Sequence, residues 1–147
     1  MKKLAPLLAL VACAGSHHSL ESKEILDRPE TAKEVTVQHV LLGWSWLAGD
    51  YRRMGMSLDQ RAEHRTETQA DELAAQLLGR CQKGDKFEQL MREYSEDPGS
   101  AATGMVYTVD EKARFVASFK ELSLKLKPGE CGLVRSQFGW HLIRRFK

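Results

Sequence analysis

Two strand-like runs, separated by most of the chain, each carry one histidine. In the final run, residues 140–146, the side chains alternate with a period of two, and His141 falls on the parity opposite the aromatic residues. This period is typical of a β-strand, and Gly139 directly before the run predicts a tight bend. A similar run at residues 35–42 contains His39. If the two strands pair, both imidazoles can meet on one face of a sheet.

The sequence between these runs has helical periodicity. Thr66 and Gln69 fit a capping box at the start of a helix. An apolar stripe with the spacing of one helical face follows it, at Ala70, Leu73, Ala74, Leu77, Leu78 and Cys81. Asp85 is expected to cap a second helix, and residues 115–122 repeat with the spacing of a third.

Strands are expected at residues 104–109 and 133–136, and residues 43–65 are expected to form a long irregular loop with three glycines. The resulting order is strand, two or three helices, strand, helix, strand, strand. Helices grouped between strands that end in a hairpin predict an α+β fold with a small, mainly antiparallel sheet.

The N-terminus resembles a targeting segment. Lys2 and Lys3 precede a short apolar run that ends at Ala12. The sequence of residues 10–13 resembles a bacterial lipobox, which predicts a signal peptide over residues 1–12 and a lipid on Cys13; an ordinary signal peptide is the alternative. By the same resemblance, a residue other than aspartate after the cysteine favours the outer membrane. The polar residues 13–33 are expected to be a flexible linker.

The charge balance limits the partners. The sequence has 22 Lys and Arg against 20 Asp and Glu, and the formal net charge of +2 comes from Lys2 and Lys3. Without residues 1–12 the two signs balance, so no overall field attracts nucleic acid or an anionic membrane. We therefore expect no nucleic-acid partner, and membrane association only through the lipid anchor.

Four segments, at residues 38–42, 87–102, 126–130 and 137–143, resemble the parvulin, or rotamase, family of peptidyl-prolyl cis-trans isomerases (PpiC-type) and occur in that family's order. The resemblance implies one domain over residues 34–147. It implies a four-stranded, mainly antiparallel sheet surrounded by about four helices. It also implies isomerisation of proline-containing polypeptides without a metal or other cofactor. Together with the targeting segment, it predicts that these polypeptides fold outside the cytoplasm.

The resemblance assigns roles to particular residues. His39, Asp97 and His141 match the polar groups beside the reacting bond. The pocket for the proline ring and its supports correspond to Val106, Phe115, Phe119 and Ser136. The family usually has two glycines, an acid, a leucine and a glycine where this chain reads Gly104-Met105-Val106-Tyr107. The segment from Glu130 to His141 is also one residue shorter than is usual.

Alternative interpretations exist for the function of the domain, for its polar residues and for its two remaining cysteines. A domain that keeps the fold but binds peptides without catalysis, as a chaperone does, is favoured by the altered residues 104–107. A hydrolase triad of His39, Asp97 and His141 is not favoured, because no serine or cysteine lies in a nucleophile-elbow motif. Cys81 and Cys131 are able to pair outside the cytoplasm, or Cys81 is simply buried on its helical stripe.

Overall fold

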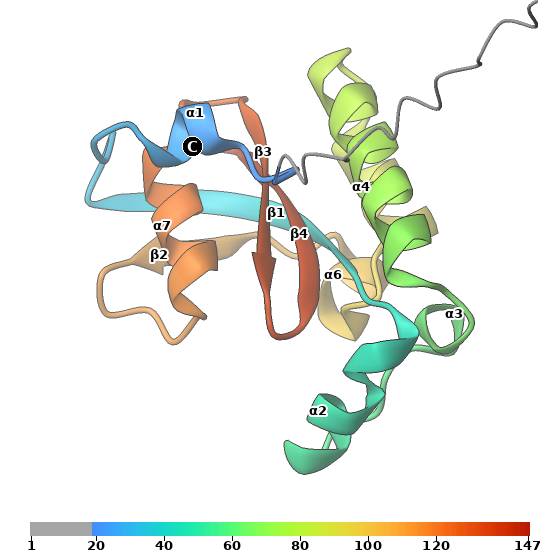
Figure 1. The fold of residues 1–147 in the computed structure, drawn as a ribbon. Helices are drawn as coiled ribbons and strands as arrows, with labels where there is room; N and C mark the ends of the chain where they lie inside the picture. Colours follow the sequence, from blue (N-terminus) through green and yellow to red (C-terminus); the bar gives the residue numbers. More distant parts are fainter. Residues whose placement is uncertain (1–18) are drawn as a thin grey trace, which may run out of the picture.

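The computed structural model describes residues 19–147 (Figure 1). The predicted signal peptide and Cys13 lie outside the described residues. Four strands form one antiparallel sheet in the order β2-β1-β4-β3, so the first and last runs of the sequence analysis are neighbours at its centre. The strands are β1 (Glu34–Leu42), β2 (Tyr107–Asp110), β3 (Cys131–Ser136) and β4 (Gly139–Arg145).

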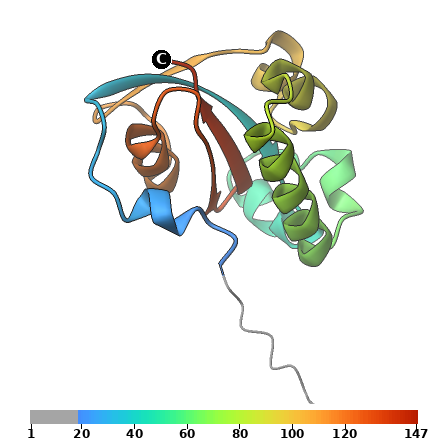
Figure 2. The same cartoon turned by 90° about the horizontal axis from the view of Figure 1, so that it is seen from above.

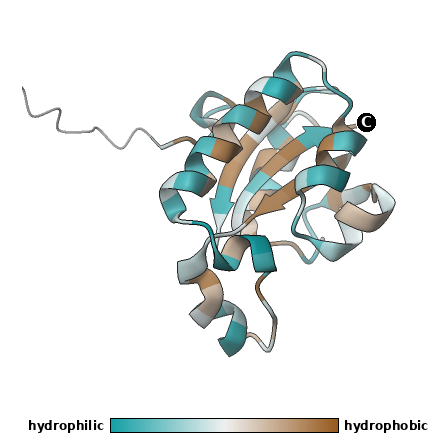
Figure 3. Cartoon of the chain, turned by 90° about the vertical axis from the view of Figure 1, so that its right-hand side faces the viewer, coloured by the Kyte–Doolittle hydropathy of each residue, from teal (hydrophilic) through white to brown (hydrophobic). Residues whose placement is uncertain are grey.

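Helices cover both faces of this sheet (Figure 2). α4 (Glu67–Gln82) and α5 (Phe87–Tyr94) pack on one face, and α7 (Ala117–Lys125) packs on the other together with α1 (Lys23–Leu26). The alternation along β1 divides its side chains between two apolar clusters, with Val40 in the first and Val37 in the second. Figure 3 shows hydrophobic residues concentrated on the strands between the helices. The predicted α+β fold is confirmed.

Local sequence accounts for the start of α4 but not for the start of α5. Thr66 accepts from the Gln69 backbone, and the Gln69 side chain accepts from the Thr66 backbone, as the capping box predicts. The cap expected from Asp85 is wrong. The residue before α5 is Lys86, which makes no side-chain cap bond, and Asp85 accepts from Arg80 at 2.7 Å.

Residues 43–65 form short helices rather than an irregular loop. They contain the 3-10 helix η1 (Ser45–Leu47), α2 (Ala48–Arg53) and α3 (Gln60–Glu63). Trp44 and Tyr51 are buried in the first apolar cluster, which ties this segment to the domain. With α1 and α6 (Pro98–Thr103), residues 19–147 contain seven α-helices, more than the four expected, because four of them have only four to six residues.

Residues 20–33 pack on the domain and do not form the flexible linker that their polar composition predicted. The Ser22 N–H donates to the Leu133 carbonyl at 2.8 Å, and the Ile25 side chain is buried against α7. The Arg28 guanidinium makes two hydrogen bonds of 2.8 and 2.9 Å to the Glu130 carboxylate. Backbone pairing, one buried side chain and this ion pair hold the segment, and none of them has a strong sequence signal. The domain therefore begins before residue 34.

A disulfide joins Cys81 on α4 to Cys131 on β3, so the open question of the two cysteines is answered by pairing. The bond connects a helix of the first apolar cluster to an outer strand of the sheet. Within residues 19–147, no helix is long and apolar enough to span a lipid bilayer.

Candidate active site

The pairing of β1 with β4 brings His39 and His141 together. Leu41 lies opposite His141, and His39 lies opposite Ile143, so the two histidines are diagonal neighbours on one face. Their rings stack with a centroid distance of 5.8 Å and an angle of 23° between planes. Both side chains are buried. The predicted meeting of the two imidazoles is confirmed.

Two phenylalanines cover this pair from the α7 side. Phe119 on α7 contacts the edges or faces of both imidazoles, with centroid distances of 5.2 Å to His39 and 5.4 Å to His141. Phe115, just before α7, stacks on Phe119 at 4.9 Å. Phe119 is buried, whereas Phe115 is half-buried. Phe115 was expected on the same helix as Phe119, but α7 begins at Ala117. The segment before the helix still brings the two rings together as one apolar wall beside the histidines.

Asp97 lies at the start of α6 and faces His39. Its Oδ2 is 2.9 Å from His39 Nε2 and also accepts a hydrogen bond of 2.9 Å from the Tyr107 hydroxyl. These bonds, the one to His39 first, hold the pKa of the Asp97 carboxyl far below its usual range despite partial burial. The carboxylate is therefore ionised at neutral pH, and His39 Nε2 carries the proton that it donates.

The loop that carries Asp97 is fixed to β1. The Glu96 N–H donates to the Leu41 carbonyl at 2.9 Å, and the Ser95 hydroxyl accepts from the Leu41 N–H at 3.2 Å. The buried Glu96 carboxylate accepts from the Gly43 N–H at 2.6 Å and pairs with Arg65. These bonds fix the position of the loop that carries Asp97. A residue that only formed a turn before Pro98 would not need them.

His141 is neutral in the fold. Burial lowers the pKa of its imidazole to about 3, with a smaller contribution from the neighbouring His39. Its Nε2 is 2.6 Å from the Ser136 hydroxyl, which also accepts from the Phe138 N–H at 3.0 Å. The Ser136 oxygen accepts the hydrogen bond from this N–H, so its own proton is free to point at His141 Nε2. Ser136 thus orients the histidine from the end of β3.

A cavity of about 510 Å³ opens in front of these groups. The lining is mainly aromatic, with polar groups on one side. It consists of His39, Leu41, Met56, Asp97, Tyr107, Arg114, Phe115, Val116, Phe119, Gln137, Phe138 and His141. A concave apolar site with a few convergent polar groups is the usual form of a ligand site. Such a site holds a ring and presents polar groups to one side of it, and it contains no activated nucleophile.

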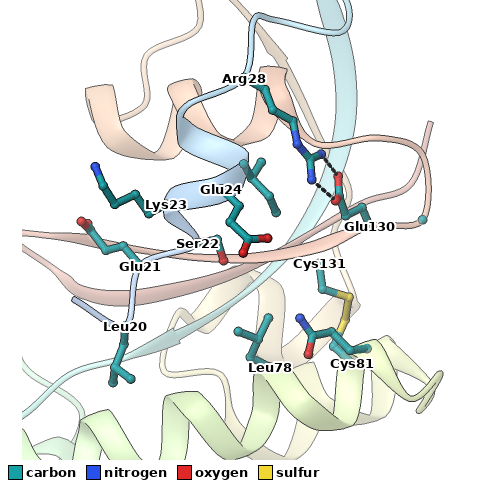
Figure 4. Close-up of a pocket in the computed structure, with 13 residues that line it drawn as sticks. Leu20, Glu21, Ser22, Lys23, Glu24, Arg28, Leu78, Cys81, Glu130 and Cys131 are labelled. Carbon is teal, nitrogen blue, oxygen red and sulfur yellow. Dashed lines mark hydrogen bonds and ion pairs between the residues drawn. A yellow bond between two sulfur atoms is a disulfide. The ribbon is translucent and has the colours of Figure 1, made fainter. Parts of the chain in front are cut away.

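A larger cavity of about 650 Å³ lies between the N-terminal segment and α4 (Figure 4). Its charged residues include Arg28 and Glu130, which are paired with each other, and the disulfide of Cys81 and Cys131 lies at one side. None of the predicted site residues line it. Size alone therefore does not identify the candidate site, and the smaller cavity combines the titratable and aromatic groups.

Most of the predicted site residues meet in the candidate cavity of about 510 Å³. His39, Asp97, His141, Phe115 and Phe119 line it. Ser136 lies behind His141 and does not line the cavity. Val106 is 42% exposed in the segment between α6 and β2 and lies outside the lining. No sequence signal indicated a site role for seven other lining residues, which are Leu41, Met56, Tyr107, Arg114, Val116, Gln137 and Phe138.

Comparison with known proteins identifies the family. Residues 22–146 match the PPIC-type PPIase domain. The chain belongs to that family. This match starts in the N-terminal segment that packs against β3, in agreement with the domain boundary seen in the fold.

Two curated relatives of this PPIC-type domain are chaperones or foldases by name. Over 112 residues the chain is 32% identical to the chaperone SurA of Pseudomonas aeruginosa, covering 76% of the chain and 23% of SurA. Over 75 residues it is 38% identical to the foldase protein PrsA of Geobacillus kaustophilus, covering 50% of the chain and 27% of PrsA. The PPIC-type domain therefore corresponds to about a quarter of each relative.

Solved structures of PPIase domains have the same fold. The crystal structure of the PPIase domain of TbPar42 is 28% identical and has a TM-score of 0.58, covering 77% of this chain and 99% of that one. The peptidyl-prolyl isomerase ESS1 from Candida albicans is 19% identical with a TM-score of 0.63, which supports the fold alone. That match covers 78% of this chain and 63% of ESS1.

Proposed function

We propose that the protein is a peptidyl-prolyl cis-trans isomerase that acts on proline-containing segments of polypeptides folding outside the cytoplasm. The observation that carries the proposal is the aromatic cavity bordered by the ionised Asp97 and the stacked histidines. Membership of the PPIC-type family and the names of its chaperone and foldase relatives support it.

The reaction needs binding and polarisation rather than covalent chemistry. Amide resonance gives the bond before proline a rotation barrier of about 18–20 kcal/mol. Phe119 and Phe115 form a wall against which the proline ring packs. Asp97, His39 and His141 lie on the polar side, where the amide twists out of its plane. Fixed polar groups in a site of low dielectric discriminate between planar and twisted amides more strongly than water does.

The cavity therefore divides the proposed roles between two groups. His39, Asp97 and His141 act at the reacting amide, and Ser136 orients His141. Phe119 and Phe115 bind the ring. Val106 was expected in this wall, but the adjacent Tyr107 takes that place.

Line-exchange NMR on a proline-containing peptide, with the purified protein, tests the proposal. Uncatalysed exchange takes about 10–100 s, and the protein should accelerate it at catalytic concentration. Asp97→Asn should slow exchange by about tenfold or more, since it removes the charge without changing the shape. Binding of the peptide without any acceleration would contradict the isomerase and leave the non-catalytic chaperone in its place.

The location of the protein is a second part of the proposal. We infer that residues 1–12 are a signal peptide, that Cys13 is lipidated, and that residues 13–21 connect the anchor to the domain at the outer membrane. The lipobox-like residues 10–13 support this, and the disulfide fits an oxidising compartment. In a bacterial host the wild type should incorporate a fatty-acid analogue. If Cys13→Ser is labelled equally, the anchor is at another position.

A further inference from the structure

Tyr107 stands at the meeting point of the polar and aromatic parts of the candidate site. It is the first residue of β2 and lies opposite Val37 of β1. Directly opposed residues of an antiparallel pair share a face, so Tyr107 projects on the same side of the sheet as His39. It is half-buried and lines the cavity.

The Tyr107 ring fills the space between the two parts of the site. Its centroid is 5.3 Å from that of His39, at 66°, and 5.5 Å from that of Phe115, at 78°. Both are edge-to-face arrangements, which are favourable between aromatic rings. The ring therefore supports the imidazole on one side and continues the apolar wall on the other.

The hydroxyl has a separate interaction. It donates to Asp97 Oδ2 at 2.9 Å, the oxygen that also lies 2.9 Å from His39 Nε2. Burial, and then the bond to Asp97, raise the pKa of Tyr107 to about 12, so the phenol keeps its proton at neutral pH. Two donors thus converge on one carboxylate oxygen and fix its direction.

We propose that Tyr107 is a positioning residue of the active site: its hydroxyl holds the Asp97 carboxylate in the orientation that His39 and the substrate amide require. This inference rests on the proposed isomerase function and deepens it. Packing alone would be satisfied by phenylalanine. The hydroxyl adds a charge-assisted bond to a partly exposed carboxylate on a loop, which would otherwise be free to rotate.

The contact between Tyr107 and Asp97 suggests a role for the altered sequence at residues 104–107. The segment differs from the usual family pattern, and this difference favoured a domain without catalysis. The change places a phenol where it reaches Asp97 and His39. The departure therefore supplies an additional donor to the polar cluster, beside His39, Asp97 and His141, which all line the cavity.

Tyr107→Phe tests the hydroxyl, because it keeps the ring contacts with His39 and Phe115. Tyr94→Phe is the matched control, since the Tyr94 hydroxyl accepts from Arg80 at 3.3 Å and lies outside the cavity. Tyr107→Phe should lower kcat for a proline peptide by about tenfold, the size expected for one charge-assisted bond. KM should change by less than about twofold. Tyr94→Phe should leave both unchanged.

An NMR titration of the Asp97 side-chain carboxyl carbon gives a second readout, which reports the hydrogen bonds that stabilise the carboxylate. Asp97 lines both the candidate cavity and a second cavity of about 340 Å³. The other charged or titratable groups that line these two cavities are His39, Tyr51, Asp59, Glu96, Tyr107, Arg114 and His141. Of these, only the Tyr107 hydroxyl is removed by Tyr107→Phe, so the Asp97 pKa should rise in that variant. It should not move in Tyr94→Phe.

The two readouts separate the inference from the function on which it rests. If the wild type fails to accelerate exchange, the isomerase proposal fails, while the titration still reports whether Tyr107 holds Asp97. If the wild type is active and Tyr107→Phe changes neither kcat nor the Asp97 titration, the positioning role is overturned. A loss of activity with an unchanged titration would also overturn it, because the effect would then not pass through Asp97.

Discussion

The imidazoles of His39 and His141 stack on each other while each binds a different partner. His39 Nε2 lies 2.9 Å from Asp97, and His141 Nε2 lies 2.6 Å from Ser136. One continuous set of contacts thus runs from the α6 loop, across β1 and β4, to the end of β3. Neither histidine can reorient without disturbing the other, because Phe119 packs on both rings.

We therefore predict that the two histidines are energetically coupled. His39→Gln and His141→Gln should each lower kcat/KM, and the double variant should be less impaired than the two single effects added together. The coupling is expected to be on the order of 0.5–3 kcal/mol, as for residues in contact. Pairing His39→Gln with the exposed Gln76→Ala on α4 should give additive effects. Additivity in the histidine pair would mean that the stacking is incidental.

Phe119 should be more important for folding than Phe115. Phe119 is 2% exposed and contacts both histidines, so Phe119→Ala should lower the free energy of unfolding by about 3–5 kcal/mol. Phe115→Ala, at a half-buried position, should cost less stability but should still weaken peptide binding. Denaturation curves and binding measurements compare the two variants. If Phe119→Ala does not fold, Phe119→Leu keeps an apolar side chain at this position while removing the aromatic ring from the wall. Equal stability losses would contradict the burial difference.

The buried His141 predicts a loss of stability in mild acid. Its pKa is lowered from 6.5 to about 3 in the fold, so between these values the unfolded chain binds a proton that the folded protein excludes. The stabilisation is complete above about pH 6.5 and is lost progressively as the pH falls toward 3. The contribution of this group at pH 5 should be about 2 kcal/mol less than at pH 7. Asp97 adds a loss of the same sign only at still lower pH.

Chemical denaturation at pH 7 and pH 5 measures this effect. His141→Asn cannot take up the proton, so its stability should change less between the two pH values than that of the wild type. The same comparison with His64→Asn is the control, because His64 is exposed. A wild type whose stability is the same at both pH values would show that His141 is not held neutral by burial.

The sequence predicted the parts of the fold that follow from regular spacing. The period of two placed His39 and His141 on one face. The helical spacing predicted one wall for Phe115 and Phe119, and the two rings do stack, although α7 begins only at Ala117. The capping box at Thr66 also formed. For the histidines and the cap, each residue's direction is set by its own element, and the family resemblance then indicated which elements meet.

The parts that depend on tertiary contacts were not predictable in this way. The Tyr107 hydroxyl finds Asp97 only because β2 pairs with β1 in one particular register. Residues 20–33 are mostly polar, and they are held by the buried Ile25, the ion pair of Arg28 with Glu130 and a few backbone bonds. Val106, next to Tyr107, was assigned to the wall, but adjacent residues project in opposite directions in extended chain. A displacement of one residue therefore decides which side chain enters the cavity.

The disulfide between Cys81 and Cys131 predicts a large dependence of stability on redox conditions. It closes a loop with a sequence separation of 50 residues, for which loop-closure entropy gives a stabilisation of about 4 kcal/mol. Urea denaturation with and without a reductant should show this loss. The variant Cys81→Ala/Cys131→Ala should be less stable than the oxidised wild type and insensitive to the reductant.

Because the disulfide lies outside the candidate cavity, kcat/KM of the folded variant should stay within about twofold of the wild type. A wild type with the same denaturation midpoint under both conditions would show that the bond does not support the fold.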